Sequence, residues 1–444
     1  MLTKFEVSNF KSIKHLELDI APFMVLVGPN GAGKTNIVQA LELFGELLRQ
    51  GSIEPIRDLG YYELIRREQK PARSGLLLGG TFRTTNADIL MRHGVTRAGS
   101  RSGRPQESDD REILLSVQFS LKVKDGEVQI SREKVIIEIE STHLSALFGT
   151  DNSVDKVEVE ADGDPEALKL ASRVLGVFSS ISARVFELKS FKKELRERLE
   201  MMRSRGRGSW LVVPRILPSR ITRQCEVTHL RLDASTLRSD AVTGERPRGF
   251  IGPAGQGLAL AVEWLKGHDR SPSDSYQLLM KHLTEVYPRI EGVDTVSLAP
   301  GRRALQFKER GIKEPLAQSS VSDGVLHAIA LLLALEPRIR KAGILAIEEP
   351  ENAIHPWALR KMIEQAQTPS LKAPLLMTTH STVVVDAIQN PSSLFIVEQE
   401  SDAGTTATPA LDKESALKSI LEDSGKKLGE YWLEGGLGGV PTID

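Results

Sequence analysis

The chain has 444 residues, 40% of them hydrophobic and 26% charged, which is enough for about two or three lobes of ordinary soluble composition. The formal net charge of −1 leaves no global basicity, so any nucleic-acid surface would be a local patch. The single cysteine, Cys225, excludes an intramolecular disulfide framework and a CxxC zinc hook. The N-terminus lacks a signal-peptide pattern and no apolar run is long enough for a membrane span, so we expect a cytoplasmic protein.

The N-terminal stretch predicts two strands, then a third strand that leads into a glycine-rich loop. Residues 3–20 alternate as a strand, a turn at Lys11-Ser12 and a second strand. The apolar run 23–27 leads directly into Gly28-Pro29-Asn30-Gly31-Ala32-Gly33-Lys34-Thr35, which fits GxxxxGK[ST]. A helix is predicted from there to about Arg49.

This loop has the chemistry of a phosphate cradle. Its glycines let backbone N–H groups converge on an anion at the helix N-terminus. Lys34 would reach the β- and γ-phosphates of a nucleotide, and the Thr35 hydroxyl would be a ligand of Mg²⁺. Because a strand precedes the loop and a helix follows it, the sequence predicts nucleotide binding. The residues assigned to it are Asn30, Gly31, Ala32, Gly33, Lys34, Thr35 and Asn36.

The middle of the chain predicts a β lobe and then a mostly helical insertion. Residues 75–92 and 112–140 have β character, and a Gly/Ser/Arg loop at Arg97–Arg104 lies between them. From about residue 142 to 290 the pattern is mostly helical. Within it, the stretch Arg184–Arg207 contains nine basic and four acidic residues. This stretch is either the solvated face of a helix, which the sequence favours, or a patch that faces nucleic acid.

After residue 320 the pattern is typical of a parallel sheet. Residues 343–347, 375–378 and 394–397 are continuous apolar runs separated by helical stretches. Such runs suit strands that are covered by helices on both faces.

A second anion cradle is predicted at Ser320–Val325, which opens an almost wholly apolar helix. The Ser-x-Gly turn of Ser322 and Gly324 could offer backbone N–H groups and a hydroxyl to an anion. Taken alone, Ser322 would be a plain helix cap.

Two carboxylates, Glu348 and Glu349, follow the strand 343–347 at its carboxyl end, where open α/β sheets place their ligand chemistry. Glu348 can orient Mg²⁺ and its water, and Glu349 can polarise an attacking water. The alternative is an exposed acidic turn. His380, at the end of the neighbouring strand, can donate a hydrogen bond to a γ-phosphate. The predicted catalytic residues are Glu349, Glu348 and His380, and the predicted metal ligands are Thr35 and Glu348.

Taken in order, these motifs resemble those of the ABC-type ATPases of the RecF/SMC/OLD group. The segments similar to that group's N-terminal motif, Walker A, signature, Walker B with catalytic glutamate, D-loop and switch histidine are Asn9–Ser12, Gly28–Thr35, Ser320–Val325, Glu348-Glu349, Ala353–Pro356 and His380. The resemblance covers roughly residues 1–140 and 295–400. It implies an α/β fold, an ABC-type (P-loop) ATPase head with a mixed sheet core, an antiparallel β lobe and a mostly helical inserted lobe.

The resemblance also implies a composite site with ATP and Mg²⁺ as its ligands. Two ATP molecules would be sandwiched between two copies, with Ser322 and Gly324 of one copy closing on the nucleotide held by Lys34 of the other. Two departures from the pattern stand out: Glu348 replaces the usual Asp, and Asp323 replaces the first glycine of the signature. Gln118 and Gln129 are both open candidates for the Q-loop glutamine.

OLD nucleases carry a C-terminal TOPRIM domain, whose strand-borne glutamate and later Asp-x-Asp are absent after His380. Asp162-Gly163-Asp164 lies upstream and is predicted to be a turn. The chain therefore resembles the ATPase half without the nuclease. Residues 428–439 are similar to the tail of stand-alone bacterial ATPases that are paired with a separate TOPRIM-like effector, as in two-gene antiphage defence systems of the PARIS type. This tail either covers an edge of its own sheet or docks the effector.

The predicted division is 1–141 for the N-terminal half of the head, 142–291 for the helical insertion, 292–400 for the C-terminal half and 401–444 for the tail. The expected function is an ATPase that forms an ATP-dependent homodimer or higher oligomer and regulates an effector encoded next door, in antiphage defence. The alternative is a RecF/SMC-like ATPase of DNA repair or chromosome maintenance. It would bind DNA through the Arg97–Arg104 loop or the Arg184–Arg207 helix.

Overall fold

The structure is a computed structural model. It describes residues 1–65, 75–85, 111–124, 127–151, 154–174, 192–193, 195–197, 200–201, 211, 213–217, 219–244, 251–267, 273–336, 343–367, 373–410, 425 and 427–438. Contacts divide the chain into two compact units. Unit 1 comprises Met1–Ile20, Gln39–Glu226 and Gln399–Thr406, and unit 2 comprises Ala21–Val38, Val227–Glu398 and Ala407–Asp444.

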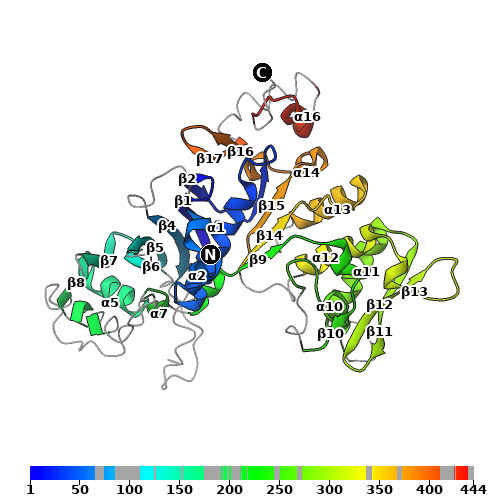
Figure 1. The fold of residues 1–444 in the computed structure, drawn as a ribbon, viewed down its shortest axis with the longest axis horizontal. Helices are drawn as coiled ribbons and strands as arrows, with labels where there is room; N and C mark the ends of the chain where they lie inside the picture. Colours follow the sequence, from blue (N-terminus) through cyan, green and yellow to red (C-terminus); the bar gives the residue numbers. More distant parts are fainter. Residues whose placement is uncertain are drawn as a thin grey trace. The chain divides into compact units, whose positions relative to one another are not determined.

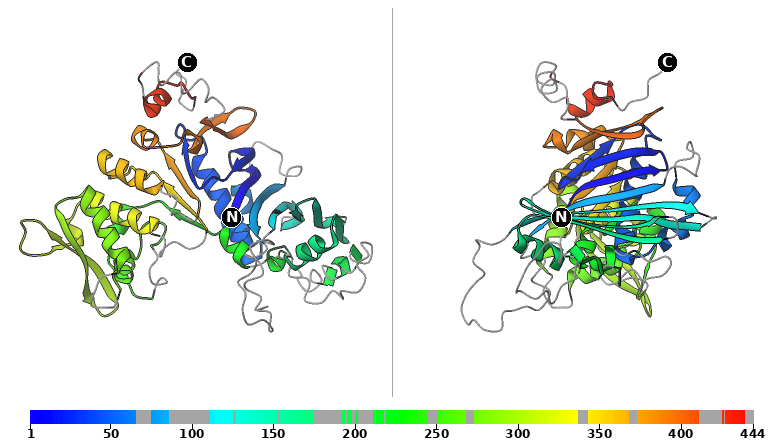
Figure 2. Two further views of the ribbon diagram at one scale, coloured as in Figure 1. Left: turned by 180° about the vertical axis from the view of Figure 1, so that it is seen from behind. Right: turned by 90° about the vertical axis from the view of Figure 1, so that its left-hand side faces the viewer.

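Unit 1 is built on antiparallel strands that form one twisted layer (Figure 2). Its strands are β1 (Leu2–Phe10), β2 (Ile13–Asp19), β4 (Leu76–Thr85), β5 (Glu112–Lys124), β6 (Glu127–Ile139), β7 (Thr142–Asp151) and β8 (Val154–Asp162). Their order is β8-β7-β6-β5-β4-β1-β2, and β17 (Gly404–Pro409) joins β2 through the pair Gly404 and Ile13. Apolar residues alternate along these strands, and the buried ones form the core.

Helices and aromatic side chains complete unit 1. Its helices are α2 (Glu54–Leu59), α3 (Tyr61–Leu64), α5 (Pro165–Val174), α7 (Val213–Ile216), α8 (Ser219–Gln224) and the later part of α1 (Lys34–Gln50). The ring of Phe44, on α1, lies 5.7 Å from that of Phe5 and 6.0 Å from that of Phe119. The predicted N-terminal motif ties these elements together, because Asn9 donates to the Gly75 carbonyl and Lys11 to the Gln39 side chain.

Unit 2 contains the predicted parallel sheet. Its strands are β3 (Phe23–Val27), β9 (Val227–Leu230), β14 (Ile344–Glu348), β15 (Leu375–Thr379) and β16 (Leu394–Glu400), in the order β16-β3-β15-β14-β9 (Figure 1). The pairings are parallel. β3, β14 and β15 are buried along their whole length, which is why their sequences are continuous apolar runs. The register places Val27 beside Thr379 and Thr378 beside Glu348, so the carboxyl ends of these three strands meet.

Helices α13 (Pro356–Ala366) and α14 (Thr382–Asp386) follow β14 and β15. The rest of unit 2 comprises α9 (Ala234–Arg238), α10 (Leu258–Lys266), α11 (Asp274–Val286), α12 (Asp323–Leu335) and the short 3-10 helices η2 (Gln318–Ser320) and η3 (Pro391–Ser393). A small sheet contains β10 (Ala241–Val242), β11 (Ile290–Ala299), β12 (Arg302–Glu309) and β13 (Leu316–Ala317). Burial of α12 from Gly324 to Ala334 explains its almost wholly apolar sequence.

The described part of the tail packs on helix α14. Helix α16 (Leu428–Leu433) buries Trp432 and presents Leu433 to solvent. The backbone N–H of Gly429 donates to the Asp386 carboxylate over 2.8 Å, and a Cβ at Gly429 would lie 2.6 Å from the Thr382 carbonyl oxygen. The tail thus covers part of its own unit, and its docking of an effector stays a prediction.

One expectation is wrong in part. Thr142–Asp151 and Val154–Asp162, assigned to a mostly helical insertion, are the strands β7 and β8. Leu144, Ala146 and Phe148 place buried apolar side chains at every second position, which is the period of a strand, and pairing with β6 extends the antiparallel layer. The contact units also divide at Glu226 and Val227, inside the predicted 142–291 segment.

Candidate nucleotide site

The glycine-rich loop has the backbone that its sequence requires. Gly31 and Gly33 adopt positive φ angles of 81° and 102°, which glycine tolerates far better than other residues. Gly33 accepts the first helical hydrogen bond, from Ile37, and α1 begins at Lys34. Within the loop, Asn30 is exposed and lines a pocket, whereas Ala32 is buried. The loop therefore presents backbone N–H groups at a helix N-terminus, as predicted.

Lys34 is buried and turned onto its own loop. Its Nζ donates to the carbonyl oxygens of Gly28, at 2.8 Å, and Pro29, at 3.0 Å. Burial lowers the pKa of Lys34 to about 8, against the opposing effect of Glu349, Glu351 and Glu348. Most of the ammonium is still charged at pH 7. The Lys34 ammonium thus donates to two loop carbonyls the hydrogen bonds that it could otherwise donate to phosphate oxygens.

Glu348 is a buried carboxylate at the end of β14, with a side chain that is 4% exposed. Nε2 of His229, on β9, lies 3.2 Å from its Oε1. The Thr35 hydroxyl hydrogen-bonds to the Glu348 carboxylate. Burial acts to raise the pKa of Glu348, but His229, Thr35 and the charge of Arg231 together lower it below its ordinary value. The carboxylate is therefore ionised at neutral pH.

These groups fit a magnesium ion. Mg²⁺ prefers hard oxygen ligands from one or two carboxylates or hydroxyls, with waters and phosphate oxygens completing its shell. Thr35 and Glu348 bring a hydroxyl and an ionised carboxylate together beside the loop, as this chemistry requires. A hydroxyl within hydrogen-bond distance of a carboxylate is placed to share a cation with it.

Glu349 departs from the strand geometry. Its φ is +48°, a left-handed conformation that is rare for a residue with a side chain. Its backbone N–H donates to the Thr378 carbonyl, and its Oε2 accepts from Nδ2 of Asn352 over 3.1 Å. The chain turns at Glu349, directly after β14 ends at Glu348. Glu348 and Glu349 therefore both lie at the carboxyl end of this strand.

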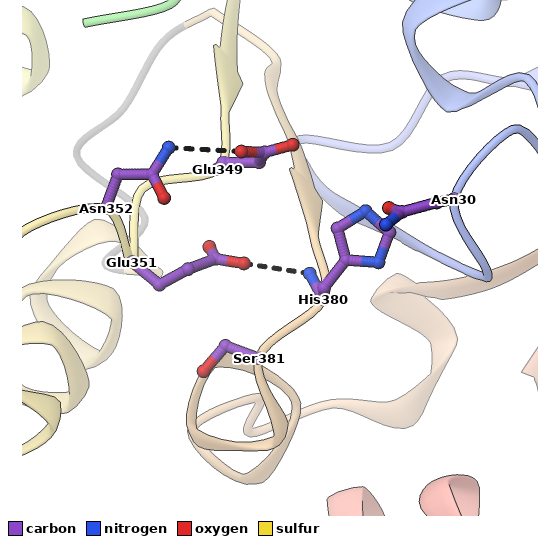
Figure 3. Close-up of a pocket in the computed structure, with 6 residues that line it drawn as sticks. All are labelled: Asn30, Glu349, Glu351, Asn352, His380 and Ser381. Carbon is purple, nitrogen blue, oxygen red and sulfur yellow. Dashed lines mark hydrogen bonds between the residues drawn. The ribbon is translucent and has the colours of Figure 1, made fainter. Parts of the chain in front are cut away.

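Glu351 holds the end of the neighbouring strand. Its Oε1 accepts from the Thr379 hydroxyl at 2.9 Å. The same oxygen accepts from the backbone N–H of His380 at 2.8 Å (Figure 3). Its Oε2 is buried and has no hydrogen-bond partner among the described residues, so it is available to a water molecule. Glu351 thereby fixes the backbone position of His380, directly after the end of β15.

Polar side chains from three loops converge on one open pocket of about 400 Å³. Figure 3 shows them: Asn30, Glu349, Glu351, Asn352, His380 and Ser381. Burial and the nearby Lys34 charge lower the pKa of His380, although Glu349 and Glu351 oppose this. Its imidazole is therefore neutral at pH 7 and can donate one hydrogen bond.

The signature segment lies at the start of α12 and does not line this pocket. Ser322 is exposed, and its side chain does not cap the helix. A Cβ at Gly324 would lie 2.7 Å from both the Ala353 carbonyl oxygen and the Tyr287 hydroxyl, so a glycine is needed for this close approach. The D-loop therefore packs directly on the signature helix.

The carboxylate of Asp323 is neutralised within the chain. The guanidinium of Arg238 donates to Asp323 Oδ1 over 2.7 Å and to the carbonyls of Ser319 and Val321 over 2.8 and 3.0 Å. One side chain of α9 thus fixes the loop before α12 and offsets the charge that departs from the signature pattern.

In the D-loop, His355 caps α13 by accepting from the Trp357 N–H, and Pro356 occupies the first turn as predicted. Asp162-Gly163-Asp164 is a turn in which Asp164 accepts from the Ala167 N–H at the start of α5.

The other segments that the sequence singled out lie apart from the pocket or outside the described residues. The Gln118 side-chain amide donates a hydrogen bond to the Glu6 carboxylate in unit 1. The Arg97–Arg104 loop lies outside the described residues, as does most of Arg184–Arg207. Within the latter, residues 192–193, 195–197 and 200–201 are helical.

Sequence reasoning missed His229, Arg238 and the role of Glu351. Glu351 could have been noticed as a third carboxylate in Glu348–Glu351. His229 and Arg238 belong to no motif and lie in the segment predicted to be helical, and only the fold brings them to Glu348 and Asp323.

Two family models match the chain. One, "AAA ATPase domain", covers residues 1–143, and the other, "AAA domain, putative AbiEii toxin, Type IV TA system", covers residues 265–386. Of the described residues, none form a helix that is both long and apolar enough to cross a membrane.

Curated relatives match shorter regions. The Septu protein PtuA of Bacillus mycoides is 28% identical over 224 residues, covering 40% of this chain and 31% of the relative. The DNA replication and repair protein RecF of Erwinia tasmaniensis is 30% identical over 119 residues, covering 27% and 30%. The OLD nuclease of Thermus scotoductus is 44% identical over 43 residues, covering 10% and 8%. The chain thus spans less than a third of the length of each of these relatives.

Among solved structures, an Smc head bound to the C-winged helix domain of ScpA aligns with a TM-score of 0.45 and 13% identity, covering 92% of this chain and 97% of that one. Over the matched regions, the chain is therefore similar to AAA ATPase domains and to the PtuA, RecF and OLD nuclease relatives. The AAA families indicate nucleotide binding and ATP hydrolysis. The helices and the parallel and antiparallel strands of the structure confirm the predicted α/β fold class.

Proposed function

We propose that this ATPase uses Mg²⁺, self-associates when it binds ATP and regulates a separate effector protein in bacterial antiphage defence. The observation that carries the proposal is the convergence of Lys34, Glu348, Glu349 and His380 on one edge of the parallel sheet. The match to the Septu protein PtuA supports the defence setting.

In the proposed reaction, the loop N–H groups donate hydrogen bonds to the phosphate oxygens, and Lys34 exchanges the Gly28 and Pro29 carbonyls for β- and γ-phosphate oxygens. Glu349 orients a water that attacks the γ-phosphorus and accepts its proton, while the bond to the β-bridging oxygen breaks. The products are ADP and phosphate. His380, neutral at pH 7, donates a hydrogen bond to the γ-phosphoryl group.

Thr35 and Glu348 would hold the Mg²⁺. Such an ion supplies charge neutralisation for the phosphate oxygens. Ser322 and Gly324 are proposed to close on the nucleotide of a second copy, since they lie at a helix N-terminus and outside the chain's own pocket.

Self-association is tested by measuring the molar mass of the chain by light scattering with ATP, ADP or no nucleotide. We expect Glu349→Gln to form the closed assembly with ATP, because it binds ATP and hydrolyses it slowly. Lys34→Ala should stay in the nucleotide-free state. An identical mass for Glu349→Gln under all three conditions would exclude ATP-dependent association. Co-purification of the protein encoded next door, with ATP and with ADP, tests effector regulation.

The ion pair of Arg238 and Asp323 makes a second prediction about this assembly. Arg238→Met would leave the Asp323 carboxylate uncompensated beside the proposed site for the partner's phosphates, and we expect association to weaken about tenfold, or about 1.4 kcal/mol. Asp323→Asn in the same chain should restore it, because the repelling charge is gone. Light scattering in the Glu349→Gln background measures both. Failure of Asp323→Asn to restore association would show that Arg238 acts only on loop structure.

The matches to RecF favour one other function, a DNA-binding ATPase of repair or chromosome maintenance. This function predicts binding to duplex DNA that weakens steeply with salt, together with ATP hydrolysis stimulated by DNA. Neutralising the basic residues of the Arg97–Arg104 loop and of the Arg184–Arg207 stretch, in separate variants, should then abolish both effects. Absence of both effects in the unaltered chain would exclude it.

A further inference from the structure

We infer that His229 is a positioning residue for Glu348. It lets a glutamate act as the metal ligand at a position where the ATPases that the motifs resemble usually have aspartate. The inference rests on the proposed Mg²⁺ site. It concerns a residue on an edge strand that no sequence motif marks.

The sheet register places His229 beside the strand that carries Glu348. His229 on β9 pairs with Ala346 on β14, in a parallel arrangement. Because side chains alternate along a strand, Ala346 and Glu348 share one face, and His229 shares that face with its partner. Alanine is small, so the imidazole can lean along the strand toward Glu348. Nε2 reaches to 3.2 Å from Glu348 Oε1.

Glu348 is buried and His229 is mostly buried, with 4% and 14% of their side chains exposed. The remainder of β14 is apolar and fully buried, so it offers the carboxylate no polar partner. Glutamate has one more rotatable side-chain bond than aspartate, so a neighbouring group is needed to fix the position of its carboxylate. The His229 ring nitrogen, 3.2 Å from Oε1, restricts this side chain to a rotamer that keeps its carboxylate beside the ring.

Arg231, two residues further along, does not fill this role. Its Nε lies 3.9 Å from Glu348 Oε2, and its side chain is 74% exposed. An exposed, long ion pair contributes little and does not fix a rotamer. Arg231 therefore provides a matched control on the same segment of chain.

The experiment compares the affinity for a fluorescent ATP analogue in Mg²⁺ and in EDTA, so that the ratio of the two dissociation constants reports the metal site without turnover. This ratio, the dissociation constant in EDTA divided by that in Mg²⁺, is the gain from Mg²⁺. For His229→Leu we expect the gain from Mg²⁺ to fall about tenfold or more, with the affinity in EDTA unchanged. His229→Gln places an amide Nε2 near the same point and should retain most of the gain. Arg231→Ala should change it less than about twofold.

Glu348→Asp is a second test that does not depend on folding of the His229 variants. A shorter carboxylate would withdraw from His229, so we expect it to lose the Mg²⁺ gain although aspartate is itself a good Mg²⁺ ligand. A full gain in Glu348→Asp, or in a folded His229→Leu, would overturn the inference. If Glu348→Gln also keeps the full gain, Glu348 is no metal ligand, and the proposed Mg²⁺ site fails together with the inference.

Discussion

Replacing Glu349 with glutamine is expected to lower the turnover number for ATP by about a hundredfold or more, while ATP binding stays close to that of the unaltered chain. Positioned general bases contribute about 10²–10⁴-fold to such reactions, and an amide cannot accept the proton from the attacking water. Glutamine has the size of glutamate, and its amide oxygen can still accept from Asn352, so the loop should keep its shape.

The measurement is phosphate release at saturating ATP and Mg²⁺, together with titration of a fluorescent ATP analogue. Lys34→Ala is the complementary variant: it should lose both binding and turnover, because it removes the ammonium that would contact the phosphates. Glu314→Gln alters an exposed carboxylate outside the pocket and should behave as the unaltered chain does. Turnover above a tenth of normal in Glu349→Gln would reject Glu349 as the base.

The frame of the site was predictable because it depends on local sequence. The apolar runs of β3, β14 and β15 are buried on both faces, and parallel pairing brings their carboxyl ends to one edge. A glycine-rich turn between a strand and a helix determines the phosphate loop in the same way. The elements therefore follow from patterns of burial and turn chemistry that span a few residues each.

The partners of the charged groups were not predictable from such patterns. His229 approaches Glu348, and Arg238 approaches Asp323, only because β9 and α9 pack beside segments more than eighty residues away in sequence. The positive φ of Glu349 is equally unmarked, since glutamate has no preference for the left-handed region. Likewise, the strands β7 and β8 are stabilised by pairing with β6, which overrides a local composition that favours helix.

Gly28→Ala is expected to give the largest loss of stability among substitutions in the phosphate loop. A Cβ at Gly28 would lie 2.1 Å from the carbonyl oxygen of Val397 and 3.1 Å from its carbonyl carbon. These are backbone atoms of β16, which pairs with β3 from Leu394 to Ile396, so they cannot move without breaking that pairing. We expect a cost of about 3 kcal/mol or more.

Gly31→Ala is the matched control, because it lies in the same loop and has nothing within 4 Å of its Cβ position. Its φ of +81° still requires a left-handed alanine, at a cost of about 1–2 kcal/mol. With about 2–4 °C in Tm for each kcal/mol in a unit of this size, thermal unfolding should separate the two variants clearly. Equal Tm values for Gly28→Ala and Gly31→Ala would mean that the close approach of the loop to β16 does not contribute to stability. A Tm for Gly28→Ala well below that of Gly31→Ala would establish that approach as the reason for glycine at the first position of the loop.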